Sequence, residues 1–553
     1  MRCSTDTSGK LLTAATAAAI LIFVLGSALN SQAGSFSPSR QQGNQERARG
    51  LIAEGVAALE KGDAAAARAL FERALRSEPN NEVAHTYLGA IADRSGDLAE
   101  AERQFAAAAI AAPTSPSARN NHGAILLRLG RVEQAAKQFE ISLRLDPKQP
   151  SALVNLAQIR FAANTPEGWR AARELFERAR AIAPDAEIAR ALVVIALRLN
   201  DAAGAAAYYR DYAGRLGSAP AALNNASARA ELGAALLAAG LSREAAAELD
   251  AAVTAEPSNV EAVILLARAY LALKEIRSAG RTLESAVARG LDAASLYAAL
   301  AELYQAAGHI ENAIPAMRLA IERDPKNEAY RFRYGMLLTD TKAPEAAIIR
   351  LREALLEFPR SSKLWFALGV AQFKHQKHDE ATVSFEHAIE FDPKFAPAMA
   401  YLGITYDETG RYAQAMTLYK RALAADERLA AAHYLLADAL LRQPSAETAT
   451  AETHLARAIS LEPSFAPARL ALARLYLRTE RFAEAATQLE MVAAAEPNLA
   501  EAQYQLSRVY VRLKRTEDAQ KALAAFKRLS DDQQKQAQTE RQELVRRLAN
   551  VNF

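Results

Sequence analysis

The sequence predicts an all-α solenoid built from about fourteen helical hairpins, and three observations lead to that fold class. Hydrophobic residues make up 51% of the 553 residues but aromatic residues only 7%, and alanine, a strong helix former, supplies much of the difference. Prolines recur mostly every 34 residues. Small residues and phenylalanine recur at fixed distances from those prolines. A chain of this length exceeds one compact core, so we expect an array whose neighbouring units bury apolar surface against each other.

The first 33 residues have the features of a targeting segment. Arg2 and Lys10 precede an uncharged run at residues 11–29, LLTAATAAAILIFVLGSAL, and small residues follow at Ser31 and Ala33. A basic, an apolar and a small-residue region in this order are typical of a signal peptide, here cleaved after Ala33. The same run is long enough to remain in a membrane as an uncleaved anchor. Both alternatives place the repeats outside the cytoplasm, because the positive charge precedes the apolar run.

We therefore expect an exported protein, either periplasmic or anchored in the cytoplasmic membrane through residues 11–29 alone. Cys3 is the only cysteine, so the chain beyond the targeting segment has no thiol for a disulfide or a metal. Residues 34–47 are polar and contain Gly, Ser and Pro, which predicts a flexible linker.

The repeat is defined by its prolines and its small residues. Proline ends each second helix because it cannot continue the helical hydrogen bonds. A Gly or Ala lies 24 residues before it, where the two helices of a hairpin cross, and Phe fills the space beside that crossing. The prolines are Pro79, Pro113, Pro147, Pro325, Pro359, Pro393, Pro463 and Pro497, and the glycines are Gly55, Gly89, Gly123, Gly233, Gly335, Gly369 and Gly403.

Stretches such as HTYLGAIADRSGDLAEAERQFAAAAIAAP and WFALGVAQFKHQKHDEATVSFEHAIEFDP closely resemble tetratricopeptide repeats, over about residues 48–531. The resemblance implies a right-handed superhelical solenoid whose first helices line a concave face. It also implies a non-catalytic scaffold that binds other proteins or peptides. We expect two arrays, residues 48–217 and 218–531, and a C-terminal capping helix over residues 532–553 that covers the last hairpin.

The boundary between the two arrays follows from the fifth repeat, at about residues 185–221. This repeat lacks the proline and the glycine at their expected places and holds Gly204, Gly214, Gly217 and Pro220 instead. Two interpretations remain open: a degenerate repeat that packs like the others, or a break between two superhelical halves.

No pattern in the sequence predicts an enzyme, a cofactor or a metal site. His375, His378 and Asp379 could offer ligands to zinc or nickel, but the repeat register places them in a solvated turn. The sequence has no Gly-rich phosphate loop, no CxxC and no HExxH. Its net charge of +3 creates no field that would collect on nucleic acid, so we expect no nucleic-acid partner.

The predicted groove carries aromatic and basic side chains in stripes along successive first helices. The aromatic candidates, which suit an extended or helical peptide, are Phe332, Phe366, Phe373, Tyr434 and Tyr504. The basic candidates, which suit acidic peptides or the free carboxylate at the end of a protein, are Arg474, Arg478, Arg508 and Arg512. Two alternatives stand beside these assignments: the aromatic residues belong to the hairpin cores, and the arginines pair with Glu540 and Glu543 of the C-terminal helix.

Two functional hypotheses follow. The first is a protein-interaction scaffold that acts in envelope or secretion assembly. The second is an accessory regulatory subunit of a polysaccharide synthesis or export system, or of a glycosyltransferase system.

Overall fold

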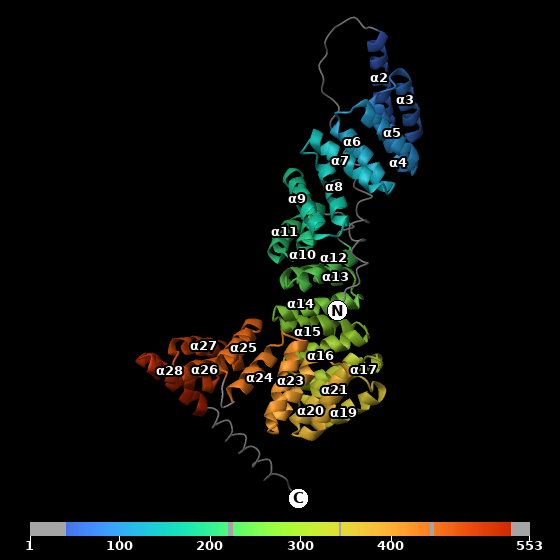
Figure 1. Cartoon of the computed structure of the whole chain (residues 1–553). Coiled ribbons are helices and arrows are strands. Elements are labelled where there is room, and N and C mark those ends of the chain that lie inside the picture. Colours follow the sequence, from blue (N-terminus) through green and yellow to red (C-terminus); the bar gives the residue numbers. More distant parts are fainter. Residues whose placement is uncertain (1–39, 219–224, 342–343, 443–446, 532–553) are drawn as a thin grey trace. The chain divides into compact units, whose positions relative to one another are not determined.

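The computed structural model describes residues 40–218, 225–341, 344–442 and 447–531 (Figure 1). Within these ranges every regular element is a helix and no strand occurs. The chain divides into two compact units between Asp292 and Ala293, and each unit is described by itself. The predicted targeting segment at residues 1–33 and the predicted capping helix at residues 532–553 lie outside the described residues.

In the first unit the helices pair into hairpins, each made of a first and a second helix. The first helices are α2 (Arg40–Glu60), α4 (Glu82–Ser95), α6 (Pro116–Arg128), α8 (Pro150–Ala162), α10 (Ala186–Arg198), α12 (Ala226–Ala238) and α14 (Val260–Ala272). The second helices are α3 (Ala64–Ser77), α5 (Leu98–Ala111), α7 (Val132–Leu145), α9 (Pro166–Ile182), α11 (Ala202–Arg215), α13 (Ser242–Ala255) and α15 (Ile276–Ala288), and the short η3 (Leu216–Ser218) follows α11. Helix α2 begins within the segment predicted as a linker, where Gln, Glu and Arg are good helix formers.

The second unit repeats this arrangement. Its first helices are α16 (Ala294–Ala306), α18 (Glu328–Thr339), α20 (Ser362–Lys374), α22 (Ala396–Glu408), α24 (Ala430–Leu441), α26 (Ala466–Arg478) and α28 (Ala500–Arg512). Its second helices are α17 (Ile310–Arg323), α19 (Pro344–Glu357), α21 (His378–Phe391), α23 (Tyr412–Ala425), α25 (Thr448–Leu461), α27 (Phe482–Ala495) and a helix at residues 516–531. The described part of the chain thus holds fourteen hairpins, which confirms the predicted all-α repeat solenoid.

Capping side chains and left-handed glycines set the ends of the helices. Asp63 Oδ1 accepts a hydrogen bond from the backbone N–H of Ala66 at 2.9 Å, which satisfies a free donor at the start of α3. Gly96 ends α4 with a φ of 84°, a left-handed conformation that glycine adopts without steric strain. These signals are local, so the hairpin boundaries follow directly from the sequence.

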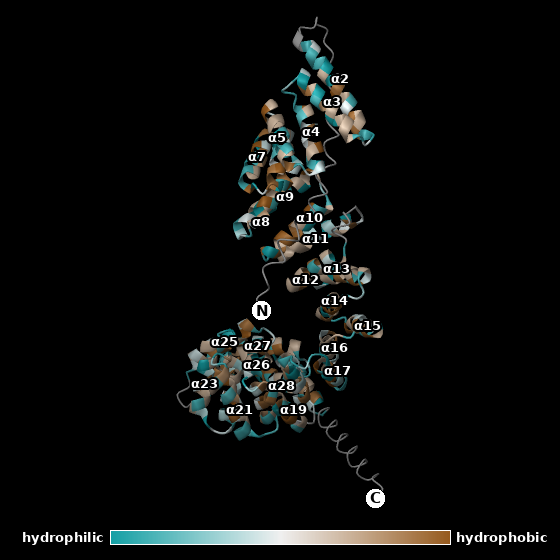
Figure 2. Cartoon of the chain, turned by 90° about the vertical axis from the view of Figure 1, so that its right-hand side faces the viewer, coloured by the Kyte–Doolittle hydropathy of each residue, from teal (hydrophilic) through white to brown (hydrophobic). Residues whose placement is uncertain are grey.

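The core of each hairpin depends on close approach of its two helices. In the third hairpin Phe139 is fully buried, and a Cβ placed on Gly123 would lie 2.7 Å from a carbon of its ring. Packed side chains do not approach so closely, so an alanine at this position would force the ring to shift. The predicted crossing point is therefore confirmed. Figure 2 shows apolar and polar residues on the same helices, as expected for helices that bury only one side.

A side chain of the first helix fixes the turn that precedes it. Trp365 Nε1–H donates to the carbonyl of Pro359 at 2.9 Å, and Arg469 Nε–H donates to the carbonyl of Pro463 at 2.9 Å. Arg469 also donates from Nη1 to Gln488 Oε1 of α27 at 2.7 Å. One side chain thus holds together the turn, the first helix and the second helix of its repeat.

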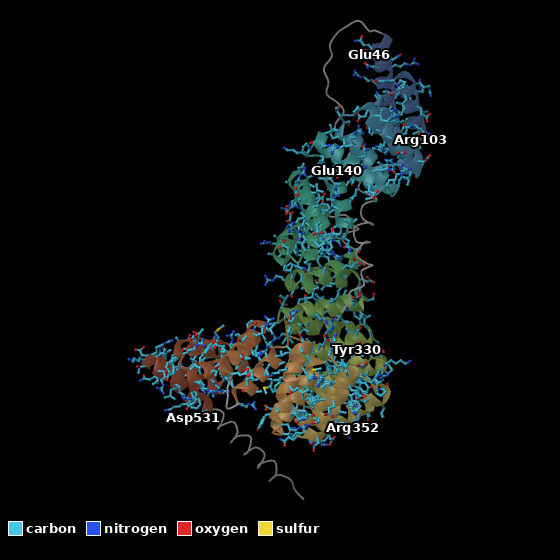
Figure 3. All side chains as sticks on the ribbon, viewed as in Figure 1. Glu46, Arg103, Glu140, Tyr330, Arg352 and Asp531 are labelled. Atoms are coloured by element: carbon cyan, nitrogen blue, oxygen red, sulfur yellow. The ribbon has the colours of Figure 1, made fainter. Side chains whose placement is uncertain are left out.

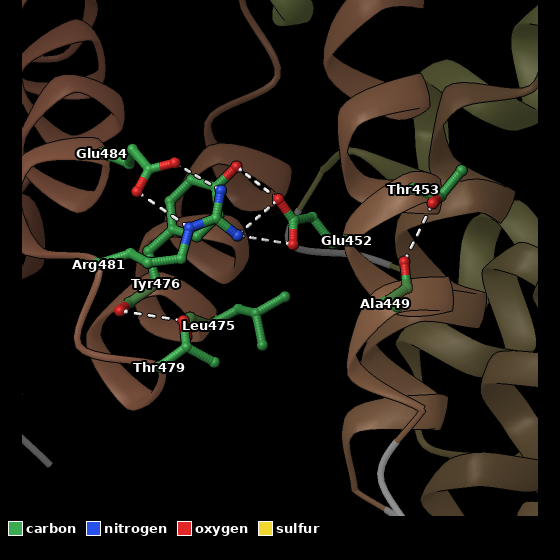
Figure 4. Close-up of polar contacts among 8 residues, drawn as sticks. All are labelled: Ala449, Glu452, Thr453, Leu475, Tyr476, Thr479, Arg481 and Glu484. Carbon is green, nitrogen blue, oxygen red and sulfur yellow. Dashed lines mark hydrogen bonds and ion pairs between the residues drawn. The ribbon is translucent and has the colours of Figure 1, made fainter.

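A second contact joins one hairpin to the next, as Figure 4 shows for α25, α26 and α27. The Tyr476 hydroxyl donates to Glu452 Oε1 at 3.0 Å, and Arg481 Nη1 lies 2.8 Å from both oxygens of the same carboxylate. The Arg481 guanidinium carbon also lies 4.1 Å from the centroid of the Tyr476 ring, a cation–π contact. The same arrangement recurs with Glu490, Tyr510 and Arg515.

The fifth repeat, α10 and α11, packs against the sixth through one buried cluster. Tyr212 of α11 and Leu232 of α12 belong to this cluster. Residues before and after the predicted boundary between the two arrays, at residues 217 and 218, therefore contribute to the same core. The Tyr209 hydroxyl donates at 2.9 Å to Glu248 of α13, whose side chain is 1% exposed. Burial raises the pKa of the Glu248 carboxyl.

Charged side chains on the second helices lie mostly in solvent. Arg103 on α5 and Arg352 on α19, both labelled in Figure 3, have side chains 74% and 59% exposed although each forms an ion pair. Such exposed pairs contribute about 0–1 kcal/mol each. Each unit is therefore stabilised mainly by its apolar core and by the buried polar contacts between its repeats.

Candidate functional site

Three successive first helices of the first unit surround a hollow of about 350 Å³. Helices α2, α4 and α6 supply most of its lining, and Ala64 and Phe105 of the second helices complete it. The volume lies in the range of sites that hold a small ligand or a few side chains of a peptide.

Small side chains at one repeated position create the hollow. Val56, Ala90 and Ala124 each follow the packing glycine of their hairpin by one residue. Because an α-helix turns by about 100° per residue, the residue after the glycine leaves the hairpin interior. Leu59 and Ile91 add apolar surface to the lining. The floor of the hollow is therefore apolar.

Tyr87 forms one wall of the hollow. Its ring stacks on Phe71 of α3, with the ring centroids 4.9 Å apart and the planes 2° from parallel. Burial, and to a smaller degree the Glu60 carboxylate, raises the pKa of the Tyr87 phenol. The phenol stays protonated at neutral pH and can donate a hydrogen bond to a ligand.

Polar residues of both charges border the apolar floor. Glu60, Arg94 and Asn121 line the hollow beside an ion pair between Asp93 and Arg128. An amide side chain such as Asn121 can both donate to and accept from a peptide backbone. An apolar floor with a polar border suits a peptide segment that inserts one apolar side chain.

The predicted aromatic residues lie mostly within the repeats. Phe332, Phe366, Tyr434 and Tyr504 are each the fifth residue of a first helix, whereas Phe373 lies further along α20. Of these five, only Tyr504 is exposed, at 41%, and the other four are half-buried. The Phe366 ring, for example, lies 5.2 Å from the ring of Phe395 and 5.4 Å from that of Tyr401, both from the next repeat. A role of these residues in binding stays a prediction.

The four predicted arginines lie on α26 and α28 with exposed side chains. Arg474 pairs with Glu501 of α28. Burial raises the pKa of Tyr434 on α24, and the nearby positive charge of Arg474 opposes that shift. The Arg508 guanidinium carbon lies 5.9 Å from the centroid of the Tyr504 ring. The structure thus brings together predicted residues in two places, while the predicted partners Glu540 and Glu543 lie outside the described residues.

His375, His378 and Asp379 lie at the turn between α20 and α21, where the register predicts them. His375 Nε2 lies 3.1 Å from Glu345 Oε1, and His378 Nδ1 lies 3.7 Å from Glu408 Oε2. Nowhere in the described ranges do three or more His, Cys, Asp or Glu side chains gather as metal ligands.

The described helices include none that combines the length and the apolar character needed to cross a membrane. The apolar run at residues 11–29 lies outside the described residues.

Large side chains in the sequence do not mark the hollow of the first unit. Its signal in the sequence is the small residue after the packing glycine in three consecutive repeats, at Val56, Ala90 and Ala124. A hollow is marked by side chains that are small, and such residues are common in an alanine-rich protein. Only the register of the three helices identifies these positions as one surface.

Similar solved structures include yeast Tom70 (16% identity, 85% of this chain and 97% of that chain, TM-score 0.40) and the APC/C hetero-tetramer Cut9–Hcn1 (15% identity, 85% and 98%, TM-score 0.37). PilF of Pseudomonas aeruginosa is also similar, at 20% identity over 38% of this chain and 95% of that chain, with a TM-score of 0.33. No curated protein sequence matches significantly. The tetratricopeptide-repeat family matches residues 52–116, 121–168, 236–303, 294–327, 372–439 and 445–503, more than half of the chain, which therefore belongs to the tetratricopeptide-repeat family.

Proposed function

We propose that this protein is a non-catalytic scaffold that binds a segment of a partner protein in the hollow of α2, α4 and α6. Tetratricopeptide-repeat folds generally mediate protein–protein interactions and are typically non-catalytic. The observation that carries the proposal is the hollow itself, with its apolar floor and its border of both charges. We further propose that the scaffold acts outside the cytoplasm, in envelope or secretion assembly. The sequence of the first 33 residues supports that location.

The size of the hollow limits what it can contribute to affinity. Burying one large apolar side chain of a partner contributes about 1.5–3 kcal/mol. A dissociation constant of about 1 μM corresponds to about 8 kcal/mol. The hollow therefore acts as an anchor point, and the partner must make further contacts along neighbouring first helices.

Site-specific photo-crosslinking tests the binding site. A photoreactive residue in place of Ala90, in the hollow, should capture a partner protein in cells, and mass spectrometry should identify it. The matched control carries the same residue in place of Arg103, whose side chain is 74% exposed on α5. The variant Ala90→Trp, which fills the hollow, should abolish co-purification of the captured partner. Equal capture at both positions, or unchanged co-purification with Ala90→Trp, would show that the hollow is not the site.

The identity of the captured partner also separates the two functional hypotheses. An envelope or secretion component supports the scaffold, whereas a polysaccharide synthesis or export protein supports an accessory subunit.

Cell fractionation with N-terminal sequencing tests the location. A soluble exported protein that starts at Gly34 indicates a cleaved signal peptide, and an intact N-terminus in the membrane fraction indicates an anchor. A soluble cytoplasmic protein with an intact N-terminus contradicts the proposed location.

A further inference from the structure

Of the methionines in the described ranges, only one presents its side chain to solvent. Met317 and Met399 lie in the core, 1% and 2% exposed, and Met336 and Met416 are half-buried. Met491 of α27 is 47% exposed. An oxidant in solution reaches an exposed thioether directly, whereas it reaches a core thioether only when the fold opens locally. Met491 is therefore the methionine that a dissolved oxidant meets first.

A buried arginine contacts the sulfur of Met491. Arg469 of α26 is 6% exposed, and its Nη1–H donates to Met491 Sδ at 3.2 Å. The same guanidinium donates at 2.9 Å to the Pro463 carbonyl and at 2.7 Å to Gln488 Oε1. These two shorter, charge-assisted hydrogen bonds fix the guanidinium. One side of the Met491 sulfur thus faces a donor that is held in place.

The two sides of this sulfur atom are therefore not equivalent. A thioether sulfur has two lone pairs, and it is a weak hydrogen-bond acceptor. One lone pair of Met491 Sδ accepts from Arg469, and no other described residue donates to this sulfur. An electrophilic oxygen attacks a lone pair, so attack favours the one that Arg469 leaves open. Because each lone pair leads to a different sulfoxide epimer, the folded protein should form one epimer in excess.

We propose that Met491 is an oxidation site that takes one oxygen atom from hydrogen peroxide and forms mainly one sulfoxide epimer. The oxygen–oxygen bond of the peroxide breaks, and a sulfur–oxygen bond forms. The sulfur loses two electrons, and the peroxide is reduced to one water molecule, which keeps both peroxide protons. The inference goes beyond the proposed function, because it requires no partner protein and does not involve the hollow of the first unit.

The surroundings of Met491 allow the sulfoxide to form without loss of the fold. The new oxygen adds on the side away from Arg469, and the exposure of the side chain leaves this polar atom in contact with water. Arg469 keeps its hydrogen bonds to Pro463 and Gln488. The same oxidation at Met317, which is 1% exposed, would instead place a polar oxygen in the core. Oxidation of Met491 alone should therefore leave the melting temperature unchanged.

Timed oxidation of the full-length protein with hydrogen peroxide tests the site. Mass spectrometry of the digested protein measures the gain of one oxygen atom at each methionine. Met491 should be oxidised about tenfold faster or more than Met317 and Met399, because those two react only from an opened state. Brief treatment yields protein oxidised at Met491 alone, which should melt at the same temperature as the untreated protein. Equal rates at Met491 and Met317, or a lower melting temperature after this brief treatment, would overturn the inference.

Two classes of methionine sulfoxide reductase, each specific for one epimer, measure the stereochemistry after digestion. In protein oxidised in the folded state, one class should reduce about two- to fivefold more of the Met491 sulfoxide than the other, the ratio that one weak hydrogen bond provides. Oxidation of the same protein unfolded in urea is the matched control and should give nearly equal amounts of the two epimers. Arg469→Leu, oxidised without urea, should also give a ratio near one, because it lacks the donor to the sulfur. Equal amounts of the two epimers from the folded, unchanged protein would refute the role of Arg469.

Discussion

The contact between Gly123 and Phe139 yields a quantitative prediction about the repeat core. A Cβ on Gly123 would lie 2.7 Å from the ring of Phe139, which is fully buried. Overpacking of this kind costs about 1–3 kcal/mol. Alanine is favoured over glycine in a helix by about 0.8–1 kcal/mol. Gly123→Ala should therefore range from neutral to about 2 kcal/mol less stable.

The double variant isolates the steric part of that balance. Phe139→Leu alone costs about 1–2 kcal/mol, less than the about 3–5 kcal/mol for removal of the whole ring. A leucine side chain can shift away from an added Cβ more easily than a flat ring can, so Gly123→Ala should then retain more of its helix-propensity gain. The two changes should be non-additive by about 1–3 kcal/mol. The protein itself offers a precedent, since Ala473 faces Leu489 at the equivalent positions of α26 and α27, and both are buried.

Hydrogen exchange of the α6 amides and urea unfolding followed by circular dichroism measure these changes. Local exchange is needed because a repeat array can unfold in parts. Gly50→Ala is the control, because Gly50 is exposed in α2 and a Cβ there would meet nothing within 4 Å. That variant should be stabilised by up to about 1 kcal/mol. Additivity of the Gly123 and Phe139 changes within about 0.5 kcal/mol would refute the steric explanation.

Two further predictions concern polar contacts of the second unit. The Nδ1 atoms of His433 and His454 lie 2.8 Å apart, a hydrogen bond that needs one unprotonated nitrogen, and burial together with His433 lowers the pKa of His454. The fold thus favours the neutral form of His454, so this contribution to stability is present at pH 7.5 and declines below about pH 6.5. In thermal melts, the melting temperature of His454→Gln should fall less on acidification than that of the unchanged protein. An identical fall would argue against the pair. Tyr476→Phe removes the hydroxyl that donates to Glu452 and should lower the free energy of unfolding in urea by about 1 kcal/mol. An unchanged midpoint would mean that this hydrogen bond does not stabilise the fold.

The amino-acid sequence by itself determined the fold class and the register of the repeats. The reason is that the signals are local: proline ends a helix, Asp63 caps one, and Gly123 permits the approach of a ring sixteen residues later on the same hairpin. Each signal acts within one hairpin, and the period repeats it along the sequence. The predicted position of Arg478 and Arg512 on matching faces also follows from this register.

Only the tertiary structure decided which side chains pack between one repeat and the next and which remain on the surface. The sequence does not reveal that Phe366 packs against the next repeat, because Phe395 and Tyr401 come from another hairpin. Glutamate usually lies on the surface, yet the side chain of Glu248 is 1% exposed and accepts a hydrogen bond from Tyr209. The hollow of α2, α4 and α6 exists because three small side chains, each one repeat apart in the sequence, lie on adjoining helices. Contacts between repeats depend on the shapes of several hairpins at once, which no single stretch of sequence specifies.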